Sequence, residues 1–419
     1  MTNVPARPPN QLALSAFWFA LEAHWAAMLG AAMQAQVVRF IPAGSIGTAT
    51  AILSATGAFF SIASQFGAGR ISDRLNRRIP FVIVGTCLNV AALIGFALSP
   101  SFLAVIIAFV AVQIALNIAN GPYQALIPEK VAPNRYGSAS AVMAEYRLAG
   151  NAAGLILAKV LVKQPGPSVP PAVVEHGLLS LSVALSLVLL IALAITVLGV
   201  RDTPARQEPA AAVTEPWRER TSFVWLLISR SFVSMGLYLI VPFFAFFLRF
   251  ALHVEAYIQE SLTLLLIMIA CALAGALPAG ILGDRVPKKT IMFGALALLA
   301  AGAFLLATSS TAGSLVPLAI ALGVAWGAYY SVDWALACTL VQPGRVGALM
   351  AIWNIGASGP QVLSPLLGGV VADRVGASVH DLGAGYRLLF EFMAAYVGLG
   401  AIALAFVREQ RAGKAAQTG

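Results

Sequence analysis

Long apolar runs alternate with short polar connections along the whole chain, and this alternation restricts the fold more than any other feature. Each run reaches the roughly 20 residues that a helix needs to cross a bilayer. Helices are expected because backbone polar groups in lipid must be satisfied within the segment itself. We predict an all-α polytopic membrane protein with twelve spans: 12–38, 45–67, 79–98, 102–127, 138–163, 177–199, 221–248, 258–279, 290–308, 313–341, 346–371 and 388–407.

The amino-acid composition excludes several classes of protein for this chain. Only 10% of the 419 residues are charged, whereas soluble proteins carry about a quarter. This excludes a disordered chain and an ordinary cytosolic enzyme, and the net charge of +9 comes without the basic tract that a nucleic-acid partner requires. Cys87, Cys271 and Cys338 lie in apolar runs without metal-ligand spacing, so no metal, disulfide or cofactor is expected.

One polar connection is much longer than the others. Residues 201–220 combine proline, alanine and mixed charges, which is typical of a flexible linker. We therefore predict two six-helix halves, 1–200 and 221–419, joined by this linker.

The distribution of Lys and Arg predicts the orientation. Of 26 such residues, 18 fall on one side of the predicted spans and six on the other, and Arg147 and Arg230 lie within spans. Because cytoplasmic loops carry the excess of positive charge, both termini and the linker are expected on the cytoplasmic side of the cytoplasmic membrane. The same basic loops are expected to contact anionic lipids.

The two halves repeat at an offset of about 210 residues. Arg39-Phe40 recurs as Arg249-Phe250, and the segment 69–78 recurs as 280–289 with an Asp-Arg pair followed by two basic residues in both copies. A series of matches at one offset indicates duplication, and parallel repeats place a substrate site near the midplane between them.

At this point the sequence resembles the major facilitator superfamily over essentially its whole length. The segment 69–78 (GRISDRLNRR) is similar to the signature loop between spans two and three, and 280–289 is similar to its second copy. Asn76 and Pro287 stand where the family usually has glycine, which predicts a looser turn in both copies.

The charged loop predicts a gate latch. Asp73 can pair with Arg77 or Arg78 and can accept hydrogen bonds from a helix N-terminus, where the dipole is positive; the resemblance implies that this helix is span eleven. The alternative is that these cations only set topology. The latch residues are Asp73, Arg74, Arg77, Arg78, Asp284, Arg285, Lys288 and Lys289.

Five ionisable residues lie well inside predicted spans and matter most for function, because charges there are costly and mark functional sites. At 1.5 Å per residue they share one depth, about 10–15 Å from the cytoplasmic end, so pairing is expected. Arg230 can neutralise either Glu22 or Asp333 in a purely structural pair, and Glu145 and Arg147 point to different sides of one helix. The proton-coupling candidates are Glu22, Asp333, Glu145, Arg230 and Arg147.

Five spans each carry one polar or aromatic stripe at helical spacing, which predicts a hydrated substrate cavity. The alternative for the tryptophans is an interfacial belt, and His24 is expected to be a packing residue. The cavity candidates are Trp18, Trp25, Gln113, Asn117, Asn120, Gln124, Ser234, Tyr238, Trp326, Tyr330, Asn354, Ser358 and Gln361.

These features predict a monomeric transporter with a small-molecule substrate. Secondary transport is expected because the chain has no nucleotide-binding loop, which an ATP-driven pump requires. Residues 121–128 with 137–141, 331–336 and 353–356 are similar to the glycoside–cation and sucrose–proton symporter branch, which implies a sugar or other small polar solute coupled to protons rather than to sodium. The main alternative is proton-coupled export of drugs or amphipathic molecules. A receptor or scaffold is disfavoured because it needs no wet cavity.

Overall fold

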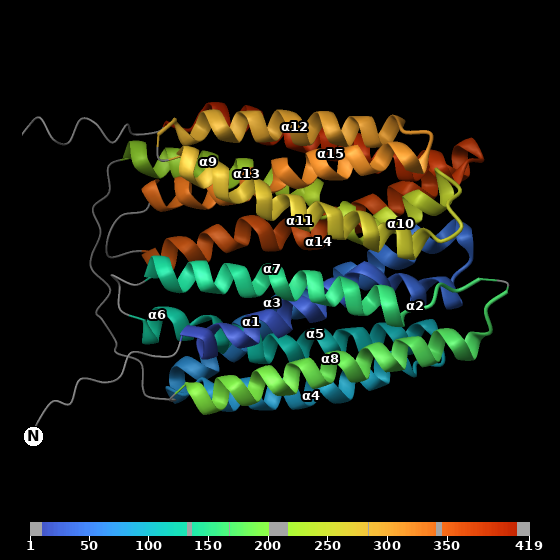
Figure 1. Cartoon of the computed structure of the whole chain (residues 1–419), viewed down its shortest axis with the longest axis horizontal. Coiled ribbons are helices and arrows are strands. Elements are labelled where there is room, and N and C mark those ends of the chain that lie inside the picture. The colour runs from blue at the N-terminus through green and yellow to red at the C-terminus, as the bar shows by residue number, and fades with distance from the viewer. Residues whose placement is uncertain are drawn as a thin grey trace, which may run out of the picture. The chain divides into compact units, whose positions relative to one another are not determined.

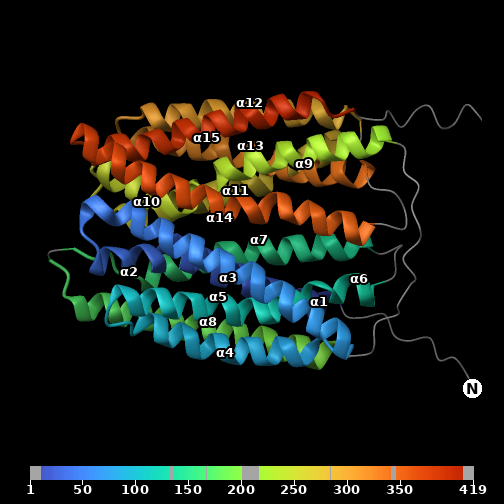
Figure 2. The same ribbon diagram turned by 180° about the vertical axis from the view of Figure 1, so that it is seen from behind.

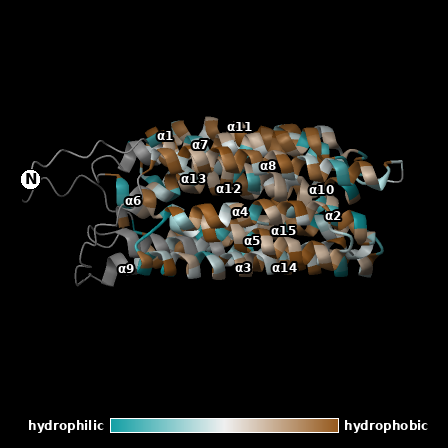
Figure 3. Ribbon diagram, turned by 90° about the horizontal axis from the view of Figure 1, so that it is seen from below, coloured by the Kyte–Doolittle hydropathy of each residue, from teal (hydrophilic) through white to brown (hydrophobic). Residues whose placement is uncertain are grey.

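The computed structural model describes residues 11–131, 136–166, 168–200, 217–283, 285–340 and 346–408, and every regular element in these ranges is helical (Figure 1). The predicted all-α class is therefore confirmed. Apolar residues dominate the length of the helices (Figure 3). In the described part of the chain, eleven segments are long and apolar enough to cross a membrane. The predicted fifth span corresponds to the 26-residue helix α7, which the charged residues of its middle make less apolar.

The chain divides into two compact units. The first unit comprises Met1–Ala43 and Ile52–Glu208, and the second comprises Gly44–Ala51 and Pro209–Gly419. The start of α3 thus belongs to one unit and its remainder to the other. The linker predicted at 201–220 falls largely outside the described residues, which resume at 217.

The first unit is built from eight α-helices, counting only described residues. They are α1 (Gln11–Ala27), α2 (Met33–Phe40), α3 (Ile46–Leu75), α4 (Ile79–Ala97), α5 (Phe102–Gln124), α6 (Leu126–Lys130), α7 (Tyr136–Leu161) and α8 (Pro171–Gly199). Within it, α4 lies beside both α5 and α8, and α1 packs on α7 (Figure 2).

The second unit contains seven described α-helices besides the start of α3. They are α9 (Trp217–Leu237), α10 (Ile240–Phe250), α11 (Tyr257–Gly283), α12 (Lys288–Thr308), α13 (Leu315–Leu340), α14 (Val346–Val379) and α15 (Leu382–Ala405). Here α11 packs on α13, and α12 lies beside α15 (Figure 2).

Local sequence explains where several helices begin. The Ser101 side chain accepts a hydrogen bond from the Ala104 N–H at the start of α5, and Asp381 does the same for Gly383 at the start of α15. Proline occupies the first turn of α4 and of α8, where its missing N–H costs no helical hydrogen bond.

The first span of each half is interrupted. A π-helical turn, Met28–Ala32, separates α1 from α2, and a turn at Tyr238–Leu239 separates α9 from α10. The two interruptions begin 210 residues apart, which is the offset of the sequence repeat. Breaks at corresponding positions of two repeats are typical of transporter helices that line a binding site.

Close helix packing depends on glycine in both units. A Cβ atom added at Gly150 or Gly154 of α7 would collide with backbone atoms of Phe19 or Ala23 in α1. Likewise, Gly327 of α13 lies directly against the backbone of Ala272 in α11. Small residues allow such approach in membranes, where packing rather than hydrophobicity holds helices together.

We predict that Gly327→Ala destabilises the protein by about 1–3 kcal/mol, because the added methyl group forces α13 away from α11. Thermal unfolding of the purified protein measures the change. Gly398→Ala in α15 is the matched control, since nothing lies within 4 Å of a Cβ there. An equal melting temperature for Gly327→Ala and the parent protein would contradict the assigned packing.

Candidate functional site

A carboxylate, a guanidinium and an indole meet within the first unit. Nε of Arg147 in α7 lies 2.6 Å from Oε1 of Glu22 in α1. The Arg147 guanidinium also lies over the Trp18 ring, 4.9 Å from its centroid. The Glu22 side chain is 18% exposed and that of Arg147 is 36% exposed, so this pair has access to solvent.

The second unit contains the same three groups on other helices. Nη1 of Arg230 in α9 forms an ion pair and hydrogen bond with Oδ2 of Asp333 in α13. The Arg230 guanidinium lies 4.6 Å from the centroid of the Trp353 ring. Asp333 is completely buried and Arg230 is 12% exposed, so this pair is nearly sealed from solvent.

Both arrangements answer the same electrostatic problem. A charge moved from water into an apolar interior is stable only when it is paired and hydrogen-bonded. An indole face adds a cation–π attraction for the guanidinium, worth about 2 kcal/mol or more when water is excluded. Of the two partners considered for Arg230, the structure gives Asp333, while Glu22 is bound by Arg147. Trp353, which the sequence reasoning did not include among the cavity candidates, completes the second group.

The sequence gives only a weak signal for Trp353. Trp353 is 1% exposed, and the stripe predicted on span eleven consists of the polar residues Asn354, Ser358 and Gln361 instead. Gln361 is half-buried, and the side chains of Asn354 and Ser358 lie outside those described. The available signal is a tryptophan well inside its span, while other spans carry the proton-coupling candidates.

The other predicted cavity residues occupy different environments. Trp25, Asn120, Gln124, Ser234, Tyr238 and Trp326 are half-buried, and Tyr330 is exposed. Gln124 Nε2 donates to Asn120 Oδ1 at 3.2 Å, so these two amides are neighbours. Gln113 and Asn117 are buried, and Asn117 Nδ2 donates to the Gln113 carbonyl at 2.9 Å. Their role in binding substrate stays a prediction.

Two ionisable residues of the spans stand apart from the pairs. Glu145 is exposed in its unit, two residues from Arg147 and therefore on another side of α7. His24 is fully buried with its ring 4.6 Å from that of Trp25, the environment expected of a packing residue.

The charged loop after α3 is fixed by an unusual backbone conformation. Asn76 has a φ of 53°, a left-handed conformation that glycine favours and asparagine tolerates. The Arg77 N–H donates to the Ser72 carbonyl and the Asn76 N–H donates to the Asp73 carbonyl, both at 3.2 Å. These two hydrogen bonds form a Schellman motif, so asparagine at 76 retains the sharp end of α3.

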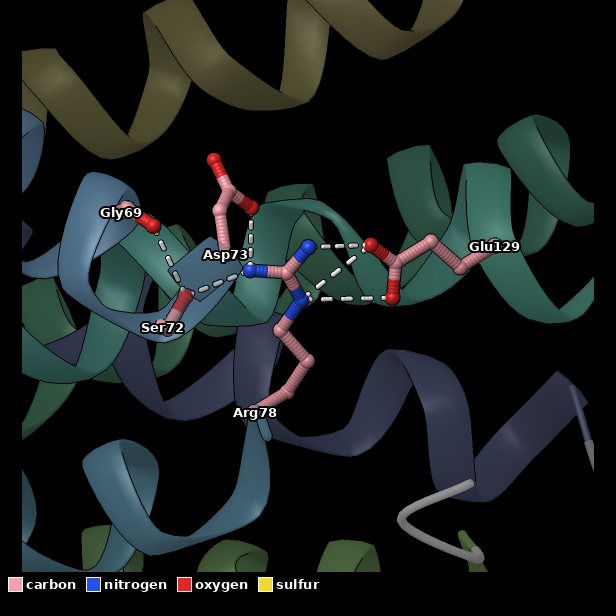
Figure 4. Close-up of polar contacts among 5 residues, drawn as sticks. All are labelled: Gly69, Ser72, Asp73, Arg78 and Glu129. Atoms are coloured by element: carbon pink, nitrogen blue, oxygen red, sulfur yellow. Dashed lines mark hydrogen bonds and ion pairs between the residues drawn. The ribbon is translucent and has the colours of Figure 1, made fainter. Parts of the chain in front are cut away.

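That turn brings Arg78 back onto α3 (Figure 4). Its Nη1 lies 2.6 Å from Asp73 Oδ1 and donates to Ser72 Oγ at 2.5 Å. The opposite edge of the guanidinium binds Glu129 of α6 through two nitrogens. Burial alone would lower the pKa of Arg78, but the hydrogen bonds and charges of Glu129 and Asp73 raise it above its ordinary value. Asp73 thus pairs with Arg78, one of its two predicted partners, and Glu129 is a further partner of Arg78 that the sequence did not reveal.

The second copy of the loop is built differently. Lys289, which corresponds to Arg78, donates from Nζ to the carbonyls of Ala405 and Val407 at 2.6 and 2.7 Å. Pro287 has a φ of −52° and cannot adopt the conformation of Asn76. In the second copy Arg285 is exposed and Lys288 is half-buried, whereas Arg74 and Arg77 of the first copy are both exposed. Asp284 lies outside the described residues.

Comparisons with known proteins agree with this architecture. The chain matches the model of the Major Facilitator Superfamily over residues 9–276 and 232–419. It is similar to a bacterial homologue of the human lysosomal transporter Spinster in an inward-facing, occupied conformation, with a TM-score of 0.74, 15% identity and 95% of each chain covered. A structure of a bacterial Spinster homologue in an inward-facing, unoccupied conformation has a TM-score of 0.72 and 16% identity, with 95% of each chain covered.

A mutant of the nucleoside transporter NupG gives a TM-score of 0.70 at 13% identity, covering 95% of this chain and 100% of that one. At these identities the likeness shows the fold alone. No curated protein matches the chain. The matched family and its structural neighbours are membrane transporters rather than enzymes. The symporter branch named from the sequence is not confirmed by these matches and stays a prediction.

We predict that Arg230→Met destabilises the protein by about 3–5 kcal/mol, because it leaves Asp333 as an unpaired buried charge. The double variant Arg230→Met/Asp333→Leu should recover most of the loss, since it removes both charges. Thermal unfolding of the purified variants measures both effects.

The matched control is Arg39→Met. Arg39 is as buried as Arg230, each 12% exposed, but its partner Glu175, 3.3 Å away, is 43% exposed. Removing Arg39 therefore leaves a solvated carboxylate, and a pair with an exposed carboxylate contributes about 1 kcal/mol or less. Similar losses for Arg39→Met and Arg230→Met would argue against the special cost assigned to the buried pair.

Proposed function

Since the chain belongs to the major facilitator superfamily, a family of membrane transporters, we propose that it moves a small polar solute, such as a sugar, across the cytoplasmic membrane by proton-coupled alternating access. The observation that carries this proposal is the pair of carboxylate–guanidinium–indole groups, Glu22–Arg147–Trp18 and Asp333–Arg230–Trp353. Each half of the repeat contributes one group.

Proton coupling follows from how such a pair responds to a proton. When the carboxylate is protonated it loses its charge, and the guanidinium loses the partner that compensated for its burial. The arginine then rearranges, and a later return of the arginine expels the proton. A site of this kind links protonation to conformation without any cofactor.

The two pairs differ in a way that suits successive steps. Glu22 and Arg147 are partly exposed, whereas Asp333 is completely buried. In this conformation a proton therefore reaches Glu22 more readily than Asp333. We propose that Glu22 exchanges protons with solvent in this state and that Asp333 does so after Arg230 has moved.

The predicted cavity residues suit a polar solute with an apolar face. Trp25, Tyr238 and Trp326 are half-buried aromatic residues on three of the spans, and Asn120, Gln124 and Gln361 supply half-buried amides. Aromatic faces stack on the apolar side of a sugar ring while amides bond its hydroxyl rim. The similarity of segments such as 121–128 to sugar symporters supports the same substrate class.

The charged loop is the proposed cytoplasmic gate latch. Arg78 holds one oxygen of Asp73, and Figure 4 shows the other carboxylate oxygen directed away from it. Span eleven remains the proposed partner of that oxygen. Glu129 fixes Arg78 from the opposite side, so Asp73 keeps its position when the latch opens.

A second candidate function is export of amphipathic molecules. It is favoured by an apolar groove of about 390 Å³ in the first unit, lined by α1, α7 and α8 through residues such as Phe19, Tyr146 and Val188. A hydrocarbon chain suits such a lining better than a sugar does.

We predict that Glu22→Gln and Asp333→Asn each abolish uptake driven by a pH gradient while substrate exchange continues, because the amide cannot carry a proton through the cycle. Proteoliposomes with an imposed gradient measure uptake, and counterflow measures exchange. Glu175→Gln is the matched control, since Glu175 also pairs with an arginine, Arg39, outside the proposed site. Gradient-driven uptake at the parent rate in both site variants would rule out coupling through these pairs.

The substrate class is tested by a thermal-shift screen of the purified protein against sugars, nucleosides, organic acids, lysolipids and lipophilic cations. We expect stabilisation by a sugar or related solute, because a ligand that binds only the folded state raises its melting temperature. Trp25→Ala should weaken that stabilisation. Shifts confined to lysolipids or lipophilic cations would instead favour export.

A further inference from the structure

A carboxylate near the end of α14 caps the start of α3, far away in the sequence. The Gly47 N–H donates to Asp373 Oδ1 at 3.0 Å, and the Thr48 N–H donates to Asp373 Oδ2 at 2.6 Å. The first N–H groups of a helix have no partner within the helix and lie at the positive end of its dipole. Asp373 therefore satisfies two such donors with a buried negative charge.

Two glycines make this contact possible. A Cβ atom at Gly47 would lie 2.6 Å from Asp373 Oδ1 and 2.6 Å from the Gly369 carbonyl oxygen. A Cβ atom at Gly369, one turn before Asp373, would collide with the Gly47 backbone and with Ala51. The two helices thus touch backbone to backbone, and a side chain at either position would separate them.

The division of the chain shows why the cap matters. Gly44–Ala51 belong to the second compact unit together with Asp373, while α3 from Ile52 onward belongs to the first. One continuous helix of 30 residues is shared between both units. Any movement of one unit relative to the other must therefore bend α3 near Ala51 or break the cap.

We propose that Asp373 is a switchable latch, closed in this conformation and released in the opposite state of the transport cycle; the proposal rests on the alternating access argued above. It acts on the side of the membrane opposite to the Asp73 loop, because α3 is about 45 Å long and these contacts lie at its two ends. In the released state α3 moves as a whole with the first unit. The start of α3 and the end of α14 then become accessible to water.

Two variants test the latch without any need for substrate. Asp373→Asn keeps the size of the side chain but removes the charge that binds both N–H groups. Gly369→Ala forces the helices apart by one methyl group. The matched control is Asp381→Asn, because Asp381 also caps a helix, accepting from Gly383 at 2.8 Å, but only within its own turn.

Accessibility is read at Thr50, which is completely buried. Thr50→Cys is introduced after Cys87, Cys271 and Cys338 have been replaced by alanine, and the purified protein reacts with a hydrophilic maleimide. Amide exchange of residues 46–53 is followed in parallel by mass spectrometry. Size-exclusion chromatography confirms that each variant is folded and monodisperse.

We expect Asp373→Asn and Gly369→Ala to accelerate labelling at position 50 by about tenfold, the effect of losing one charge-assisted hydrogen bond, and to raise exchange across 46–53. Asp381→Asn should leave both unchanged. The proposal is overturned if labelling stays at the parent rate, even where exchange rises at residues 47 and 48, because that result describes a simple helix cap.

Failure of this proposal and failure of the proposed function are separate results. Labelling that responds to Asp373→Asn supports the latch even where Glu22→Gln and Asp333→Asn leave transport unchanged. Conversely, an unresponsive position 50 overturns the latch while proton coupling through the two pairs stands on its own assay.

Discussion

The pairing of carboxylates inside the spans with arginines is the interaction on which the interior of this protein depends. An isolated charge in a membrane span is unstable, so Glu22 and Asp333 each require a cation within reach. The structure supplies Arg147 and Arg230, each against a tryptophan ring. The helices that carry these residues must stay in register for the pairs to form. Helix packing through glycines such as Gly150 and Gly327 sets that register, and the charge pairs in turn make it specific.

The sequence was sufficient for the helical class and for the identity of the charged residues, because apolar length and intramembrane charge are local properties. It left the partner of Arg230 open, since Glu22 and Asp333 were predicted at the same depth. Only the packing of α9 against α13 selects Asp333. Glu129, Trp353 and Asp373 escaped prediction for a related reason, because each acts on a residue at least 51 positions away in the chain, and nothing local marks such a contact.

The duplicated loops show how far two copies of one motif diverge. Arg78 uses a left-handed asparagine to turn back onto Asp73 and recruits Glu129, whereas Lys289 follows a proline and binds the end of α15. The charges are repeated but their partners are not. By contrast, Arg39 and Arg249 lie over Phe40 and Phe250 in the same way, 5.1 and 4.9 Å from the ring centroids. The repeat therefore conserves one contact geometry and changes another.

The interruptions of the first span in each half have a mechanical consequence. A helix bends most easily where its regular hydrogen bonding is broken, here at Met28–Ala32 and at Tyr238–Leu239. Each of these spans therefore consists of two helical segments joined by a hinge, and its charged residue, Glu22 or Arg230, lies on the segment before the hinge. The segment after the hinge, α2 or α10, can tilt while the charge pair remains intact. In the proposed transport cycle, bending these two short helical segments encloses the solute while both ion pairs are still formed.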